Sequence, residues 1–132
     1  MSIKVSIDAS GGDFGFPVTI SAGINALMSF SDLHLNFVGD EKGIKEELER
    51  KSIHKSLLDR IDITHASEII NMDDSPSIAL RHKKDSSMRV AINLVQSGIS
   101  DACVSAGNTG ALMSIARFVL KTIEGVDRPA IM

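Results

Sequence analysis

A run of small and polar residues, SAGNTG at residues 105–110, stands between an apolar strand-like segment and a helical pattern. Its two glycines permit backbone conformations closed to other residues, and they let the backbone come close to a ligand. Amides at a helix start attract anions, and the amide and hydroxyl side chains add hydrogen bonds. The run therefore predicts either a neutral cradle for a phosphate or polarised carbonyl, or a plain helix N-cap. The candidate ligand contacts are Ser105, Gly107, Asn108, Thr109 and Gly110.

A second glycine-containing loop, DASGGDFG, occupies residues 8–15 after a strand-like run. Paired glycines, here Gly11 and Gly12, can form a nest of N–H groups for an anion. Asp8 and Asp13 flank the pair, and their carboxylates could hold a donor group or a metal, or only cap the next turn. Capping is the commoner outcome for such aspartates, so this loop alone is a weak signal.

Two lysines and two serines form a third candidate loop in HKKDSSM, residues 82–88. Lysine is a good point-charge partner for phosphate, and serine hydroxyls can donate hydrogen bonds to it. The simpler interpretation, which the residues favour, is a solvated charge pair followed by a serine N-cap. A serine nucleophile is not indicated, because no histidine or other base stands nearby in the sequence. The candidate phosphate contacts are Lys83, Lys84, Ser86 and Ser87, with Asp8 and Asp85 as polar support.

The scaffold that must position these loops follows from the periodicity of the chain. Strands are expected at residues 3–8, 33–40, 60–66 and 101–107. Helices are expected from Pro17, over residues 41–50, from Pro76 after a Ser75 cap, from Ser86 or Ser87 to Gly98, and along an apolar stripe from Leu112 to Ile123. This alternation predicts a mostly parallel sheet covered on both faces. All three loops would then open onto one sheet edge, where ligands bind in such folds.

Composition and charge indicate an ordinary globular domain, with 43% apolar residues and a net charge of −3. This charge argues against nucleic-acid binding, which needs a dense cationic face. Cys103 is the only cysteine and the histidines lack metal-ligand spacing, so we expect a reducing compartment and no metal. No leader pattern and no apolar run of roughly 20 residues is present. We therefore expect a cytosolic, single α/β domain over residues 1–132.

The candidate loops also resemble those of a known family. The segments that carry the resemblance are DASGGDFG, VGD, ALRHKKDSSMRVAINLV, and VSAGNTGAL followed by DRPA. They closely resemble the amino-terminal part of the PlsX family. That family comprises the phosphate:acyl-acyl-carrier-protein acyltransferases of bacterial phospholipid synthesis. The resemblance runs from Val5 to Ala130, and KKDSSMRVA and VSAGNTGAL are its most specific pieces.

The resemblance implies a Rossmann-like α/β/α sandwich in which inorganic phosphate cleaves the acyl thioester of acyl-acyl carrier protein, giving acyl phosphate and free carrier. It also implies a homodimer in peripheral contact with the cytoplasmic membrane, with no metal or organic cofactor. Phosphate is already an anionic nucleophile near neutral pH, so glycine amides, Asn108 and Thr109 would position it or stabilise the developing oxyanion. Lys83 or Lys84 would offset phosphate charge or contact the acidic carrier.

The chain departs from the family in two respects. Ser10 stands where the family usually has methionine, and family members are much longer. We therefore expect an incomplete carboxyl end, exposed apolar surface, and little acyl transfer by the isolated chain. Two other hypotheses stay open: a phosphotransacetylase-like enzyme that uses coenzyme A, and a non-enzymatic fragment that at most binds phosphate.

Overall fold

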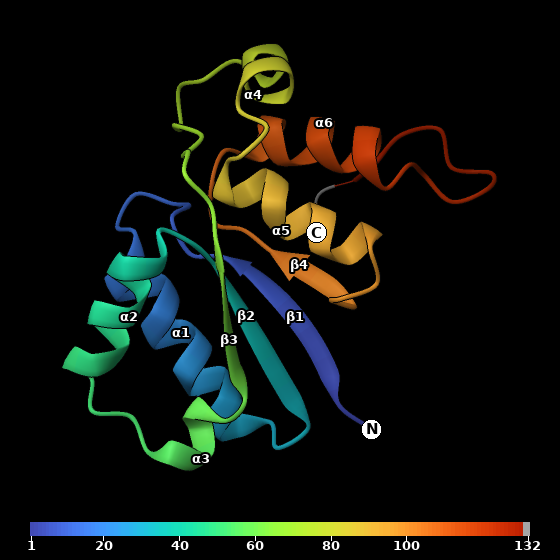
Figure 1. Cartoon of the computed structure of the whole chain (residues 1–132). Helices are drawn as coiled ribbons and strands as arrows, with labels where there is room; N and C mark the ends of the chain where they lie inside the picture. Colours follow the sequence, from blue (N-terminus) through green and yellow to red (C-terminus); the bar gives the residue numbers. More distant parts are fainter. Residues whose placement is uncertain (131–132) are drawn as a thin grey trace.

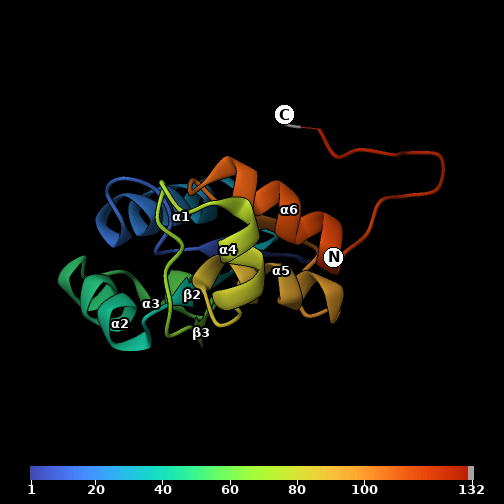
Figure 2. The same cartoon turned by 90° about the horizontal axis from the view of Figure 1, so that it is seen from above.

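The computed structural model describes residues 1–130, which form a four-stranded sheet with helices on both faces (Figures 1 and 2). The strands lie in the order β3-β2-β1-β4, and every pairing is parallel, so the predicted α/β fold is confirmed. The strands are β1 (Ile3–Asp8), β2 (Leu33–Gly39), β3 (Ile61–His65) and β4 (Ala102–Val104).

The helices divide between the two faces of this sheet. The first three pack on one face, while α5 packs on the other face with α4 and α6 stacked beyond it (Figure 1). Parallel sheets are covered in this way because the crossover helices must lie above or below the strands. The helices are α1 (Phe16–Ser29), α2 (Glu41–Arg50), α3 (Lys55–Leu58), α4 (Pro76–His82), α5 (Ser87–Gln96) and α6 (Thr109–Val119).

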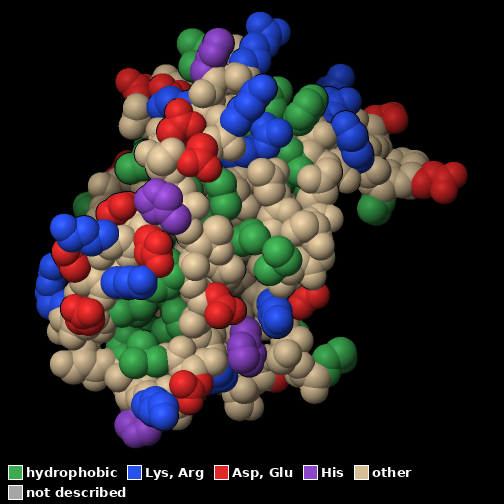
Figure 3. All heavy atoms as spheres, viewed as in Figure 1, with side chains coloured by type: hydrophobic (Ala, Val, Ile, Leu, Met, Phe, Trp, Pro, Cys, Tyr) green, Lys and Arg blue, Asp and Glu red, His purple; other side chains and the backbone are tan. Residues whose placement is uncertain are grey.

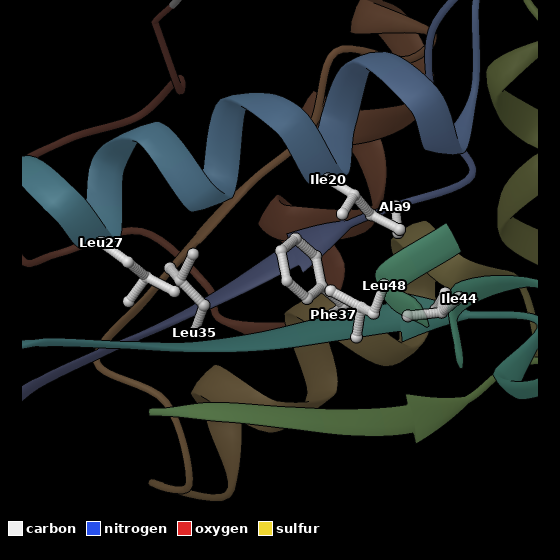
Figure 4. Close-up of a cluster of buried hydrophobic side chains, with 7 residues drawn as sticks. All are labelled: Ala9, Ile20, Leu27, Leu35, Phe37, Ile44 and Leu48. Carbon is white, nitrogen blue, oxygen red and sulfur yellow. The ribbon is translucent and has the colours of Figure 1, made fainter. Parts of the chain in front are cut away.

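The core beneath α1 is built around Phe37, which is fully buried (Figure 4). Gly23 of α1 lies directly over this ring, since a Cβ placed on it would stand 2.6 Å from Phe37 Cζ. The glycine therefore lets α1 approach β2 closely. Ile20 and Leu27, which lie on one face of α1, are both buried in this cluster.

Hydrogen-bonding side chains set most helix starts where the sequence predicted them. Ser75 caps α4, with Pro76 as its first residue, and Ser86 caps α5 through the amide of Arg89. The helix predicted to stop at Gly98 ends at Gln96, and Gly98 makes the following turn with φ 78°. The short helix α3 was not predicted, because four residues are too few to show a helical period.

Several predicted element ends differ from the structure. The stripe expected to reach Ile123 stops at Val119, because the chain turns at Lys121, where φ is 67°, and Ile123 is 78% exposed. The strand expected over residues 101–107 is only Ala102–Val104. It ends there because Ser105 turns its hydroxyl toward the Asp8 carboxylate. The strand predicted over 33–40 ends one residue earlier, at Gly39, and the strand predicted over 60–66 is shorter by one residue at each end.

The charged face of α2 is a solvated surface. Glu41 and Lys45 pair across one turn at 2.8 Å, and acidic and basic side chains are interspersed over the face of the molecule in Figure 3. Among residues 1–130, no helix combines the length and apolar character needed to cross a membrane.

Candidate functional site

The three candidate loops meet at Asp8, the last residue of β1. Its carboxylate is 2% exposed. Oδ1 accepts hydrogen bonds from the Gly11 amide at 3.0 Å and from the Ser87 hydroxyl at 2.5 Å, and Oδ2 accepts one from the Ser105 hydroxyl at 2.7 Å. Asp8 therefore ties together the loop after β1, the start of α5 and the loop after β4. This is the convergence on one sheet edge that the alternating pattern predicted.

The glycines around Asp8 are required by close packing of the loops. A Cβ on Gly11 would stand 2.5 Å from Asp8 Oδ2 and 3.2 Å from the amide nitrogen of Gly107. The Gly107 amide in turn donates to the Ser105 hydroxyl at 3.0 Å. Because the amides of Gly11 and Gly107 are both occupied within the chain, neither is a free donor for a ligand.

Asn108 is the N-cap of α6, and its side-chain amide is fully used. Oδ1 accepts from the Ala111 amide at 3.1 Å. Nδ2 donates to the carbonyl oxygens of Asn71, Met72 and Asp74, at 3.1, 3.3 and 2.8 Å. The side chain is 8% exposed. Of the two interpretations of this residue, helix capping is therefore the one that its geometry supports, and Asn108 also fastens the segment 71–74 against α6.

Lys83 is engaged in an ion pair within the chain. Its ammonium group donates to the Asp74 carboxylate and, at 2.8 Å, to the Ile69 carbonyl. The hydrogen bond from Lys83, followed by one from the Asn71 amide, holds the pKa of Asp74 below its ordinary value. Lys84 is exposed and makes no ion pair within residues 1–130, so it is the cation of this loop left for a ligand.

The remaining residues of the third loop are also structural. Asp85 accepts hydrogen bonds from the amide and hydroxyl of Ser67, which lower the pKa of the Asp85 carboxyl, the hydroxyl contributing most. Ser86 and Ser87 are both buried, one as the cap of α5 and the other as a donor to Asp8. These contacts fasten the start of α5 to the segment after β3. Ser67 and Asp74 were not predicted as partners, because only the fold brings them near the lysine loop.

Backbone amides are the donors that remain open at this edge. Within residues 1–130, the amides of Gly12, Thr109 and Gly110 donate to no protein acceptor. Gly12 has φ 89°, and a Cβ on it would lie 3.3 Å from the Ala106 carbonyl, so the loops after β1 and β4 lie side by side. Thr109 and Gly110 are the first residues of α6, where unpaired amides and the helix dipole both favour an anion.

The site has donors for an oxyanion but no cluster of metal ligands. No group of three or more His, Cys, Asp or Glu side chains placed to hold a metal occurs among the described residues. Asp13, whose carboxylate was a candidate for a ligand contact or a turn cap beside Gly11 and Gly12, is exposed. The arrangement can therefore bind an anion through amides at the start of α6 and in the adjacent glycine loop, with Lys84 nearby in sequence.

Comparison with known proteins places this chain in a family. The family model described as "fatty acid synthesis protein" matches residues 3–132. The chain belongs to that family. This confirms the resemblance to the PlsX type that the motifs around Asp8, Lys83 and Asn108 indicated.

Curated relatives of the chain carry the name phosphate acyltransferase. The chain is 67% identical over 132 residues to such a protein from Vesicomyosocius okutanii, and 66% identical to one from Ruthia magnifica. A relative from Francisella philomiragia is 58% identical over 136 residues. In each case the match covers all of this chain but only 39% of the relative's length.

Proposed function

We propose that this chain supplies the phosphate-binding loops of an acyltransferase that moves an acyl group from acyl-acyl carrier protein to inorganic phosphate. One observation carries the proposal: loops from three parts of the chain are held on Asp8, with open amides at Gly12, Thr109 and Gly110 on the same sheet edge. The name of the relatives, phosphate acyltransferase, supports a phosphate as the anion and an acyl group as the cargo.

The reaction needs positioning more than activation. A phosphate oxygen attacks the thioester carbonyl carbon and forms a C–O bond, which gives a tetrahedral oxyanion. The oxyanion collapses, the C–S bond breaks, and the leaving thiolate takes the proton that phosphate carried, so that acyl phosphate and a free thiol result. Positioning can contribute roughly 7–11 kcal/mol to such a step, and one well-placed oxyanion donor about 3–4 kcal/mol.

The residues divide into two roles in this proposal. The amides of Gly12, Thr109 and Gly110, with Lys84 as a nearby charge, contact the phosphate or the oxyanion. Asp8 and Asn108 do not touch the substrate; they hold the loops and the start of α6 in place. The carrier protein, a homodimer and peripheral contact with a membrane are proposed from the family resemblance, and they belong to the longer protein rather than to this chain alone.

A chimera tests this proposal. The present chain would be joined to the part of the Vesicomyosocius okutanii relative that lies beyond the match. With acyl-acyl carrier protein and phosphate, we expect it to form acyl phosphate, which hydroxylamine traps as a hydroxamate. The isolated chain should form little. Preference for an acyl-coenzyme A thioester would favour the phosphotransacetylase-like alternative, and a folded chimera that forms no acyl phosphate would contradict acyl transfer.

Thr109 offers a matched pair of variants in that chimera. Thr109→Pro removes the first amide of α6 but keeps the helix, because proline is well tolerated at this position and Asn108 before it is extended, with ψ 111°. Thr109→Ala removes only the side chain. If the amide binds phosphate, the proline variant should raise the KM for phosphate by about tenfold or more while the alanine variant stays near the parent, since a hydrogen bond to a charged group contributes about 1.5–3 kcal/mol.

A further inference from the structure

An apolar groove of about 370 Å³ runs along α1 beside strands β1 and β4. It begins at Asp8, at the candidate site, and follows α1 toward Leu33. Its walls are apolar almost throughout, yet Val18 and Val104 are 53% and 57% exposed. Its apolar walls include Val18, Ala22 and Ala26 from α1, Val5 and Ile7 from β1, and Val104 from β4.

The wall that α1 contributes is shaped for a neighbouring helix. Val18, Ala22 and Ala26 recur at every fourth position, so they form one ridge along the helix. Their small side chains leave room for a second helix axis at the usual spacing of about 8–10 Å. Sheets of parallel strands are normally covered on both faces, and α1 covers β2 while leaving β4 open on this face.

The strand beside the groove is also at the edge of the sheet. β4 pairs with β1 alone among the described residues, and Figure 1 shows it at the border of the sheet. The relatives are 66–67% identical to this chain over the 132 matched residues, and this match covers only 39% of their length. The relatives therefore carry additional polypeptide that is available to cover this apolar face.

We propose that this groove is the docking surface for an amphipathic helix supplied by polypeptide of the kind that the relatives carry beyond the match. The helix lies beside α1 and over β4, with its apolar face against Ala22 and Val104. The proposal concerns packing alone, so it holds or fails independently of whether the site at Asp8 transfers acyl groups.

Cysteine labelling tests the proposal directly. Ala22→Cys places a thiol in the groove, and Asn25→Cys places a matched thiol on an exposed part of the same helix outside it. Maleimide labelling would be followed by mass spectrometry of peptides, which separates the natural Cys103. In the isolated chain both sites should react at similar rates. In the chimera with the Vesicomyosocius okutanii relative, labelling at position 22 should slow by about tenfold or more, and that at position 25 should not change.

Four results would overturn the proposal. The first is equal labelling of the two positions in a folded chimera. The second is protection of Ala22→Cys in the isolated chain that grows with protein concentration, which would identify a second copy as the occupant. The third is that a long-chain fatty acid slows labelling of Ala22→Cys in the isolated chain, while the same position is still labelled rapidly in the chimera. The fourth is that the relative's polypeptide does not pack stably against this chain, whether it is fused to the chain or co-expressed as a separate polypeptide.

Discussion

Replacing Asp8 should show how much stability the junction of the three loops contributes. In Asp8→Ala the Gly11 amide and the hydroxyls of Ser87 and Ser105 all lose their acceptor. Each hydrogen bond to a carboxylate contributes about 1.5–3 kcal/mol. Ser87 is 1% exposed, so its hydroxyl cannot turn to water, whereas the half-buried Ser105 can be solvated. We therefore expect the free energy of unfolding to fall by about 3–5 kcal/mol, out of the 5–15 kcal/mol typical of domains.

The assay is urea unfolding followed by circular dichroism, with Asp8→Asn as a milder variant. Its side-chain oxygen can still accept from Gly11 and Ser87, while its amide faces Ser105, whose hydroxyl oxygen can accept instead. We expect this variant to lose only about 1–2 kcal/mol. It provides a measurement even if the alanine variant does not fold.

A double-mutant cycle isolates the Asp8–Ser87 contact. Ser87→Ala should cost about 1.5–3 kcal/mol in the parent but close to nothing in the Asp8→Ala background, because the hydroxyl has already lost its acceptor there. The reasoning is refuted if Ser87→Ala costs the same in both backgrounds. It is also refuted if Asp8→Ala lowers the free energy of unfolding by less than about 1 kcal/mol.

The remaining predictions concern the supports of α6 and of the lysine loop. Asn108→Ala should lower stability by about 1 kcal/mol or more through the lost cap. Asn108→Asp should keep the cap but lose the Nδ2 donor, so it should release only the segment 71–74, seen as faster hydrogen exchange there than in the parent. Exchange in this segment that stays at the parent rate in Asn108→Asp would contradict the second role. Asp74 has a lowered pKa, so its pairing with Lys83 stabilises the fold above the ordinary carboxyl pKa of about 3.9 and is lost as pH falls through the lower folded value. An NMR titration should show the Asp74 pKa rising in Lys83→Met, and an unchanged pKa would show that the pair is not its cause.

The scaffold of the molecule was predictable because its signals are local. The apolar runs of β1 and β2, and the caps at Ser75 and Ser86, depend on neighbours within a few residues. The alternation of strands and helices predicted that the three candidate loops lie at one edge of the sheet. The sequence also raised capping as an alternative for Asn108, and the structure supports it.

The roles of individual site residues were not predictable, because they depend on contacts between distant segments. Ser105 and Asp8 are separated by 97 positions, and no periodicity indicates that they touch. The pairing of Lys83 with Asp74 likewise depends on how α4 folds back over the loop before it. Lys83, one of the two lysines that suggested phosphate binding, is therefore engaged within the chain. The open donors are backbone amides in the two glycine loops that the sequence indicated, but which of those amides stay open depends on the folded contacts.

The most direct test of the phosphate cradle is a phosphate titration of the isotopically labelled chain, followed through its backbone amide NMR signals. We expect saturable shifts at Gly12, Thr109 and Gly110, absent with chloride, and smaller shifts at Gly11 and Gly107, whose amides are bound within the chain. A well-dispersed spectrum that phosphate leaves unchanged would contradict the cradle. So would shifts confined to exposed lysines, because they would show charge attraction without the amides.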